Sequence, residues 1–368
     1  MRNQKQLFKG LLIIAAIIVF LVGCSSPSSN DETPTTIANE NETETENNDT
    51  TNTETTDSQE VEEVDYPIVI EHAFGETVIE SKPERIATIQ WANHDVALAL
   101  GVVPVGFSAA NFGVEDDSGL LPWTAAKLDE LGVTEPNIYQ DTDGLDFEAI
   151  ADSNPDVILA AYSGITQEDY DILVQIAPVV PYTNTPWVTT WREQIMLNAK
   201  GMGMEAEGEE LIATTENLIQ EKASEYPEME GKKVVWVNFS ANDMSRLHLY
   251  TPVDPRVSFL NELGMVNPES VTEQIEDENS YSLRLSAENA DVLNDADILI
   301  GYGDESLYEA VKADPLLGQI PAIQRGSVVF IGNGTSLAAS GTPNPLSIAY
   351  TIDDYLELIG ESISKINE

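Results

Sequence analysis

Short apolar runs alternate with longer segments of helical periodicity through most of the chain. The runs rich in Val and Ile are predicted strands, and they fall at residues 85–90, 156–160, 233–238, 297–300 and 327–331. Strands that are apolar throughout and separated by helices are typical of parallel sheets covered on both faces. The pattern therefore predicts an α/β fold.

Two segments depart from this alternation. Residues 68–80 form two alternating runs around Phe74-Gly75, which predicts a small β-hairpin. Residues 191–228 carry no strand signal and are rich in helix-forming residues, broken mainly by Gly201 and Gly203. We expect two Rossmann-like lobes with mostly parallel central sheets, at 66–190 and 229–368, joined by one long α-helix within 191–228.

The N-terminus has the pattern of an export signal. Basic residues precede an apolar run at 11–22, and Gly23 and Cys24 follow it. The run is about a dozen residues, shorter than the roughly 18 to 20 that a membrane-spanning helix needs. Residues 1–23 are a predicted signal peptide.

The cysteine after the apolar run is the only one in the chain. The string Leu21-Val22-Gly23-Cys24 resembles a bacterial lipobox, which implies that Cys24 becomes the lipidated, palmitate-carrying first residue of the mature protein. An ordinary signal peptide or a signal anchor with an incidental cysteine is the alternative. Residues 24–65 are almost without apolar side chains and strongly acidic, which predicts a disordered tether.

The formal net charge is −47, and the folded part keeps a large acidic excess. Nucleic acids and anionic membrane surfaces are therefore poor partners, and we expect a monomer.

The sequence carries no motif of a common enzyme class. A nucleophile elbow, a P-loop, a dinucleotide-binding glycine pattern and a zinc-protease helix are all missing. The histidines, His72, His94 and His248, are far apart, so we expect no protein-bound metal and no cofactor. The chain is predicted not to be an enzyme.

Several strings resemble one family, the periplasmic-binding-protein-like receptors for iron-siderophores and cobalamin. They are Lys82 to Ile86, Ala97 to Gly101 with Pro104-Val105-Gly106, Leu145 to Ile150 followed by Asn154 to Ile158, Trp191 to Gln194, Asn289 to Ile298 and Ala322 to Val329. The resemblance implies two lobes joined by a rigid helix, with the ligand in the cleft between them. It also implies one surface glutamate per lobe that docks on importer arginines, matching Glu148 and Glu288. Both could instead be acids that stabilise the first turn of a helix.

Ligands of open α/β sheets bind beyond the carboxyl ends of the strands. Aromatic rings and guanidinium groups there suit a large, often anionic chelate. The predicted ligand contacts are Trp91, His94, Phe107, Tyr162, Trp187, Arg192, Phe239, Arg246, Tyr250, Arg284, Tyr302 and Ser336. For Arg192 the alternative is a salt bridge to a glutamate, and for the aromatic residues it is packing within a lobe.

These observations predict a lipid-anchored binding protein on the outer face of the cytoplasmic membrane of a Gram-positive cell. The expected ligand is a ferric siderophore of undetermined class, delivered to an ABC permease dimer with its ATPase subunits. The siderophore already saturates the iron, so no protein ligand to the metal is needed. Haem or cobalamin is the alternative cargo, and haem would require a Tyr or His at the centre of the cleft. An extracellular hydrolase or an adhesive surface protein is a more distant alternative.

Overall fold

A computed structural model of the chain describes residues 64–141 and 143–366. The predicted signal peptide, Cys24 and the tether up to residue 63 lie outside the described residues. Within the described ranges, no helix has both the length and the apolar character needed to cross a membrane.

The first described element is the predicted β-hairpin. Strands β1 (Ile68–His72) and β2 (Gly75–Ile79) pair antiparallel, with Ile68 opposite Ile79. The side chains of Ile70 and Ile79 are buried against the first lobe. The hairpin therefore extends the core of that lobe.

The first lobe is built on a parallel sheet of order β5-β4-β3-β6-β7. Its strands are almost entirely buried, as their continuous apolar character predicts. The strands are β3 (Ile86–Thr88), β4 (Gly106–Ser108), β5 (Ile138–Tyr139), β6 (Val157–Ala160) and β7 (Val179–Pro181), and the helices are α1 (Asn93–Ala99), α2 (Pro122–Glu130), α3 (Phe147–Asp152) and α4 (Gln167–Leu173).

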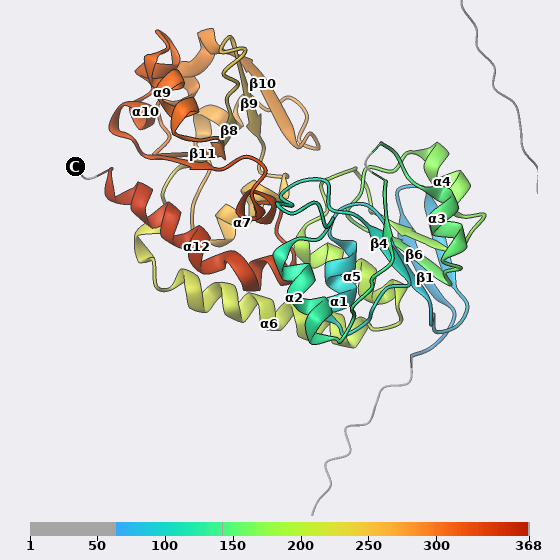
Figure 1. The fold of residues 1–368 in the computed structure, drawn as a ribbon. Coiled ribbons are helices and arrows are strands. Elements are labelled where there is room, and N and C mark those ends of the chain that lie inside the picture. Colours follow the sequence, from blue (N-terminus) through green and yellow to red (C-terminus); the bar gives the residue numbers. More distant parts are fainter. Residues whose placement is uncertain (1–63, 142, 367–368) are drawn as a thin grey trace, which may run out of the picture. The chain divides into compact units, whose positions relative to one another are not determined.

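The second lobe is built on a mixed sheet of order β10-β9-β8-β11-β12 (Figure 1). Its central strands are parallel, whereas β9 and β10 run antiparallel at one edge. The strands are β8 (Val234–Asn238), β9 (Arg246–Tyr250), β10 (Ser282–Ser286), β11 (Ile298–Tyr302) and β12 (Val328–Ile331). The α-helices are α7 (Pro255–Glu262), α8 (Glu269–Thr272), α9 (Glu305–Ala313), α10 (Pro321–Arg325) and α11 (Ser336–Ser340), and the 3₁₀ helices are η1 (Pro227–Met229), η2 (Ala287–Leu293) and η3 (Leu317–Gln319).

The segment between the lobes contains two helices rather than one. Helix α5 (Trp191–Gly201) starts with a capping box at Thr190, and α6 (Glu205–Ala223) follows it. The interruption occurs where Gly203 takes a φ of 66°, in the left-handed region that glycine adopts most readily. The longer of the two, α6, is the long helix that the sequence predicts.

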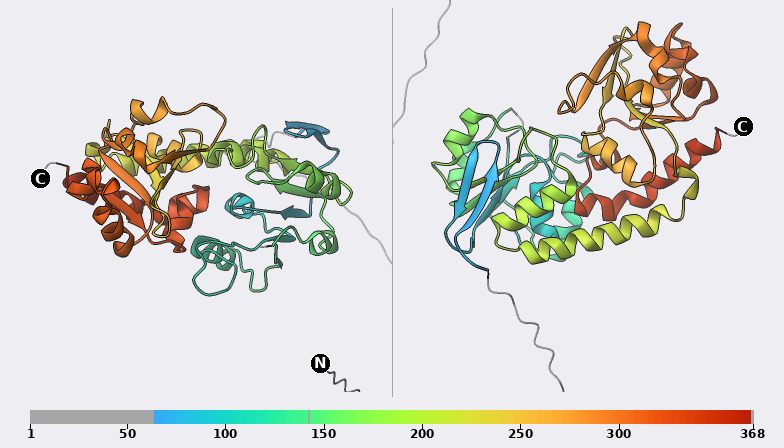
Figure 2. Two further views of the ribbon diagram at one scale, coloured as in Figure 1. Left: turned by 90° about the horizontal axis from the view of Figure 1, so that it is seen from above. Right: turned by 180° about the vertical axis from the view of Figure 1, so that it is seen from behind.

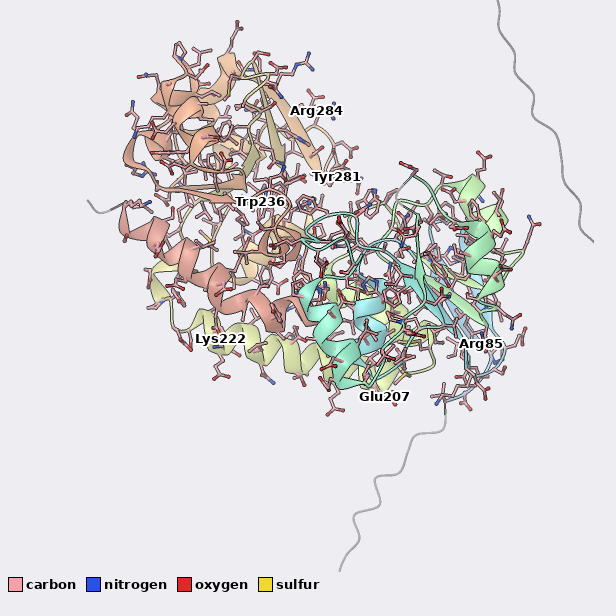
Figure 3. The ribbon with its side chains drawn as sticks, viewed as in Figure 1. Arg85, Glu207, Lys222, Trp236, Tyr281 and Arg284 are labelled. Carbon is pink, nitrogen blue, oxygen red and sulfur yellow. The ribbon has the colours of Figure 1, made fainter. Side chains whose placement is uncertain are left out.

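A second long helix, α12 (Pro345–Ser364), lies beside α6 (Figure 2). An ion pair joins them, since Lys222 Nζ is 2.7 Å from Asp353 Oδ1; Figure 3 labels Lys222 on α6. Leu346, near the start of α12, packs against first-lobe residues, and Leu356 lies in the core shared with the second lobe. The sequence pattern alone does not predict a second helix in contact with both lobes.

One hydrophobic core joins the lobes. It includes Val96 of α1, Trp191 of α5, Ile219 of α6, Trp236 of β8 and Leu356 of α12, all of which are buried. Bending the lobes apart would expose this apolar surface, which costs free energy roughly in proportion to its area. This core favours a fixed arrangement of the lobes.

Candidate functional site

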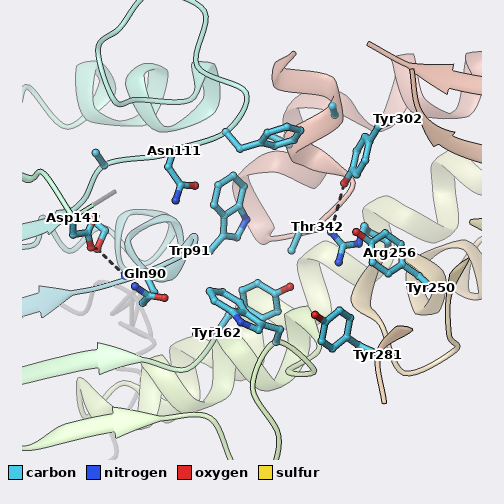
Figure 4. Close-up of a pocket in the computed structure, with 16 residues that line it drawn as sticks. Gln90, Trp91, Asn111, Asp141, Tyr162, Tyr250, Arg256, Tyr281, Tyr302 and Thr342 are labelled. Carbon is cyan, nitrogen blue, oxygen red and sulfur yellow. Dashed lines mark hydrogen bonds between the residues drawn. The ribbon is translucent and has the colours of Figure 1, made fainter. Parts of the chain in front are cut away.

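A cavity of about 390 Å³ lies between the lobes, on the carboxyl-end side of their central strands (Figure 4). Its lining is mainly aromatic and neutral polar. It consists of Gln90, Trp91, Ser108, Ala109, Asn111, Phe112, Asp141, Tyr162, Trp187, Tyr250, Arg256, Tyr281, Tyr302, Ala338, Ala339 and Thr342. A mainly apolar, concave site with a few polar groups is typical of small-molecule binding.

The turn after β3 presents Trp91 to this cavity. Gln90 and Ala92 on either side have φ values of 63° and 57°, which residues other than glycine adopt rarely. The indole Nε1 of Trp91 is buried and has no hydrogen-bond partner among the described residues. Strained backbone of this kind is often found at ligand sites.

Buried Asn93 holds this turn in place. Its Nδ2 donates to the carbonyl oxygens of Ile89 (2.8 Å) and Tyr162 (3.0 Å), and its Oδ1 accepts from the Tyr162 amide (3.1 Å). Gln194 of α5 donates from Nε2 to the carbonyl oxygen of Trp91 at 3.2 Å. The loops that carry Trp91 and Tyr162 are thereby fixed to each other and to α5.

Tyr162 and Trp187 form one aromatic pair of the first-lobe wall. Their ring centroids are 5.3 Å apart in an edge-to-face arrangement, which is a favourable geometry for aromatic rings. Gly164 permits it, because a Cβ at that position would come within 2.4 Å of the Trp187 indole nitrogen. Burial raises the pKa of Tyr162, so its hydroxyl stays protonated.

A buried carboxyl group lies at the other end of this wall. Asp141 accepts a short hydrogen bond from the Ser108 hydroxyl, and Ser108 Oγ accepts from the Gln90 amide at 2.7 Å. Burial raises the pKa of Asp141, although the bond from Ser108 opposes the rise. The three residues join β4 to the turns after β3 and β5.

The second-lobe wall carries the only cation in the lining described above. Asp254 is the N-cap of α7, and it accepts from Arg256 Nε at 2.8 Å and from Arg256 Nη2 at 2.7 Å. The guanidinium lies over the ring of Tyr250, 3.9 Å from its centroid, and Nη1 is 3.5 Å from the Tyr302 hydroxyl (Figure 4). Burial alone would lower the pKa of Arg256, but Asp254 more than reverses this and holds the pKa well above its usual value.

The structure brings some of the predicted contacts together in the cavity lining. They are Trp91, Tyr162, Trp187, Tyr250 and Tyr302, which come from both lobes.

His94 and Phe107 lie outside the lining and pack in the first lobe. Both are buried, and their rings stack with centroids 4.7 Å apart. His94 Nε2 is 3.5 Å from Asp95 Oδ1, and Asp95 also accepts from Trp123 Nε1 and Thr124 Oγ1 of α2. Burial lowers the pKa of His94 despite Asp95. These contacts hold α1 to α2, away from the cavity.

Arg192 also lies outside the lining and forms salt bridges, which was the alternative for it. Its Nε is 2.6 Å from Glu216 Oε1 of α6, and its Nη1 is 2.8 Å from Glu262 Oε1 at the end of α7. It therefore joins the helices of the connecting segment to the second lobe.

The remaining predicted contacts are distributed over the second lobe. Phe239 packs in the core against Phe330, and Ser336 begins α11, where its amide donates to Glu115 Oε1 at 3.4 Å. Arg246 is exposed at the start of β9, and Arg284 is exposed on the neighbouring edge strand β10. Neither arginine belongs to the cavity lining.

The two glutamates matched to transporter docking are both exposed. Glu148 is in the first turn of α3, and Glu288 follows the N-cap Ser286 of η2, whose hydroxyl accepts from its amide at 3.3 Å. Their positions suit a docking role and a helix-capping role equally.

Sequence reasoning missed several lining residues, of which Arg256 is the most informative. Arg256 follows Asp254-Pro255, a sequence typical of a helix start, and this helix follows strand β9. That signal could have placed Arg256 near a strand end. Asn111, Phe112 and Thr342 lie in loops, for which the sequence offers no comparable signal.

No group of three or more His, Cys, Asp or Glu side chains that could hold a metal ion occurs within residues 64–141 and 143–366.

Comparison with known proteins places this arrangement among binding proteins. The family model described as periplasmic binding protein matches residues 86–334. The crystal structure of PiaA from Streptococcus pneumoniae TIGR4 in complex with ferrichrome is 53% identical to this chain, with a TM-score of 0.78, covering 81% of this chain and 99% of that one.

Two curated relatives are more distant. The ferric enterobactin-binding periplasmic protein FepB of Escherichia coli is 28% identical over 293 residues, covering 75% of this chain and 87% of FepB. The probable siderophore-binding lipoprotein YfiY of Bacillus subtilis is 28% identical over 254 residues, covering 67% of this chain and 69% of YfiY. These relatives are extracytoplasmic binding proteins rather than enzymes.

Proposed function

This chain belongs to the periplasmic binding protein family, and we propose that it is the substrate-binding lipoprotein of an ABC importer, without enzymatic activity. It captures a ferric siderophore in the cavity between its lobes and delivers it to the permease. The bilobal α/β fold and the resemblance to siderophore receptors that the sequence predicted are confirmed by the 53% identical PiaA structure. That structure contains ferrichrome, which makes ferrichrome the first ligand to test.

The composition of the cavity is the observation that supports this cargo best. A ferric siderophore presents an organic shell around iron whose coordination is already complete. The rings of Trp91, Trp187 and Tyr162 supply apolar area for the shell, and the indole N–H of Trp91 and Nη1 of Arg256 supply donors for the oxygens around the iron. We propose that these residues contact the ligand, together with Tyr250 and Tyr302.

Haem is the second candidate, because Tyr162 and Tyr302 line the cavity. Binding of haem iron by a tyrosine uses the phenolate form. Burial raises the pKa of Tyr162, which opposes that form. This argues against Tyr162 as the ligand to haem iron.

We also propose that the protein is a monomer anchored through lipidated Cys24 on the outer face of a Gram-positive cytoplasmic membrane. Glu148 and Glu288 are the proposed docking residues for an ABC permease dimer that works with its ATPase subunits. Relatives from Streptococcus pneumoniae and Bacillus subtilis, including the lipoprotein YfiY, support this assignment. Carboxylates on separate lobes could align both with one transporter through charge-assisted hydrogen bonds.

Tryptophan fluorescence provides the test, because Trp91 and Trp187 line the cavity. Residues 62–368, which form one compact unit, are titrated with a panel of ferric siderophores that includes ferrichrome, and with metal-free ferrichrome, haemin and cobalamin. We expect saturable quenching by ferrichrome at submicromolar concentration and weaker binding of the metal-free form. Tight binding of haemin or cobalamin with no binding of any ferric siderophore would contradict the proposed cargo.

A further inference from the structure

We propose that Asp254 makes the cavity select iron chelates without net charge over anionic chelates, by cancelling the charge of Arg256 from behind the cavity wall. This inference rests on the proposed function and names the ligand class that the same site takes. Asp254 would thus be a specificity-determining residue that does not touch the ligand.

The positions of the two side chains support this division of roles. Asp254 is fully buried and absent from the cavity lining, whereas Arg256 lines the cavity with its side chain 14% exposed. Both carboxylate oxygens of Asp254 accept from Arg256, at Nε and Nη2. Nη1 makes no bond to Asp254 and lies 3.5 Å from the hydroxyl of Tyr302, another residue of the lining.

The charges of the cavity lining also favour a ligand without net charge. Among the described residues that line the cavity, Arg256 and Asp141 are the only charged side chains, and none is a lysine. An anionic chelate would therefore lose its hydration without meeting a net positive charge, which is costly. A neutral chelate needs only the hydrogen-bond donors, and Arg256 still provides them.

A structural role for Asp254 can be separated from its charge. As the N-cap of α7, its Oδ1 accepts from the Arg256 amide at 2.9 Å. Asparagine is an equally good N-cap residue, so Asp254→Asn keeps this bond and removes the charge. Asp304 offers a matched control, because it is the N-cap of α9 in the same lobe and does not line the cavity.

The experiment compares wild type, Asp254→Asn and Asp304→Asn in titrations with two ligands of different charge. Ferrichrome has no net charge, and ferrichrome A has the same trihydroxamate shell with added carboxylates. We expect wild type to bind ferrichrome more tightly. The ratio of interest is the dissociation constant for ferrichrome A divided by that for ferrichrome. In Asp254→Asn this ratio should be lower than in wild type by about tenfold or more, and the decrease should be larger at low salt. Asp304→Asn should keep the wild-type ratio.

An unchanged ratio in folded Asp254→Asn would overturn the inference, as would a wild-type preference for ferrichrome A. The double variant Asp254→Asn with Arg256→Gln decides the question if the single variant does not fold. The pair at positions 254 and 256 is neutral overall in both this variant and wild type. The ratio of the two dissociation constants should therefore agree with wild type, and a tenfold difference would overturn the inference. Failure of wild type to bind these two ligands and every other ferric siderophore of the panel would instead contradict the proposed function.

Discussion

An arginine side chain lies at each end of helix α7, one from α7 itself and one from α5, and the two have different roles. At its N-terminus Arg256 pairs with Asp254 and lies 3.9 Å above the ring of Tyr250. At its C-terminus Arg192 of α5 pairs with Glu262 and lies 4.1 Å above the ring of Trp191. The local chemistry is nearly the same, yet only Arg256 lines the cavity.

The two pairs also differ in the burial of their carboxylates. The Asp254 side chain is 0% exposed, whereas the side chains of Glu262 and Glu216, the partners of Arg192, are 22% and 47% exposed. Exposed ion pairs contribute little and tolerate change, whereas a buried pair must stay complete. An arginine that lies between an aromatic ring and a carboxylate therefore does not by itself indicate a ligand-binding site. The burial of its partner and its place relative to the cavity must also be known.

The largest effect is expected for Arg256→Gln. This substitution leaves the Asp254 charge buried without its partner, and we expect a loss of about 3–5 kcal/mol in the free energy of unfolding, together with weaker ferrichrome binding. Chemical denaturation and fluorescence titration measure the two quantities. In the double variant with Asp254→Asn, stability should recover while binding stays weak. Wild-type affinity in the folded double variant would show that Arg256 does not contact the ligand.

The two rings beneath the arginines should also respond differently. Tyr250→Leu removes part of the cavity lining, and we expect ferrichrome affinity to fall about tenfold. Trp191→Leu removes a side chain that is 1% exposed, and we expect a loss of about 2 kcal/mol in stability with unchanged affinity. Equal losses of affinity in the two folded variants would remove the distinction between the ends of α7.

A smaller effect is expected for Arg192→Gln. Its carboxylate partners are partly exposed, so the free energy of unfolding should fall by at most about 1 kcal/mol. Ferrichrome affinity should stay at the wild-type value, with Lys200→Gln as a control for the loss of one positive charge from α5. A tenfold loss of affinity would place Arg192 in the binding site after all.

The last expected effect is a pH dependence of stability that neither arginine causes. Burial lowers the pKa of His94 below its ordinary value of 6.5, so on acidification the unfolded chain takes up a proton before the folded chain does. Stability should therefore fall as the pH drops below about 6.5, by at most about 1.4 kcal/mol per pH unit from this residue. Thermal melts of His94→Gln should show a shallower slope between pH 7 and 5, with a remainder from His72 and His248, whose pKa values burial also lowers. An identical slope would contradict this assignment.

Much of the fold could be predicted because its signals are local. Apolar runs such as 156–160 and 233–238 became the buried strands β6 and β8, and the alternating run at 68–80 became the β1–β2 hairpin. The double role of α12 could not be predicted, because amphipathic periodicity shows that a helix has a buried face but not which partners cover it.

Part of the site could be predicted from the positions of the strand ends. Trp91 and Tyr162 follow β3 and β6 directly and line the cavity, as the strand-end rule predicts. Arg192 was predicted as a contact because guanidinium groups suit an anionic chelate, but the sequence does not say which side of its helix faces the cleft. Arg256 was missed because its pairing with Asp254 and Tyr250 becomes evident only when α7 is placed beside β9.

The most direct test of the central claim is the position of iron in a crystal of this protein grown with ferric ferrichrome. The anomalous signal of iron locates it without a model of the ligand. We predict a single iron site in the cavity between the lobes, bounded by Trp91 and Trp187 on one side and by Tyr250 and Arg256 on the other. Iron beside Arg192, or a ligand-free cavity in a protein that binds ferrichrome in solution, would contradict this account.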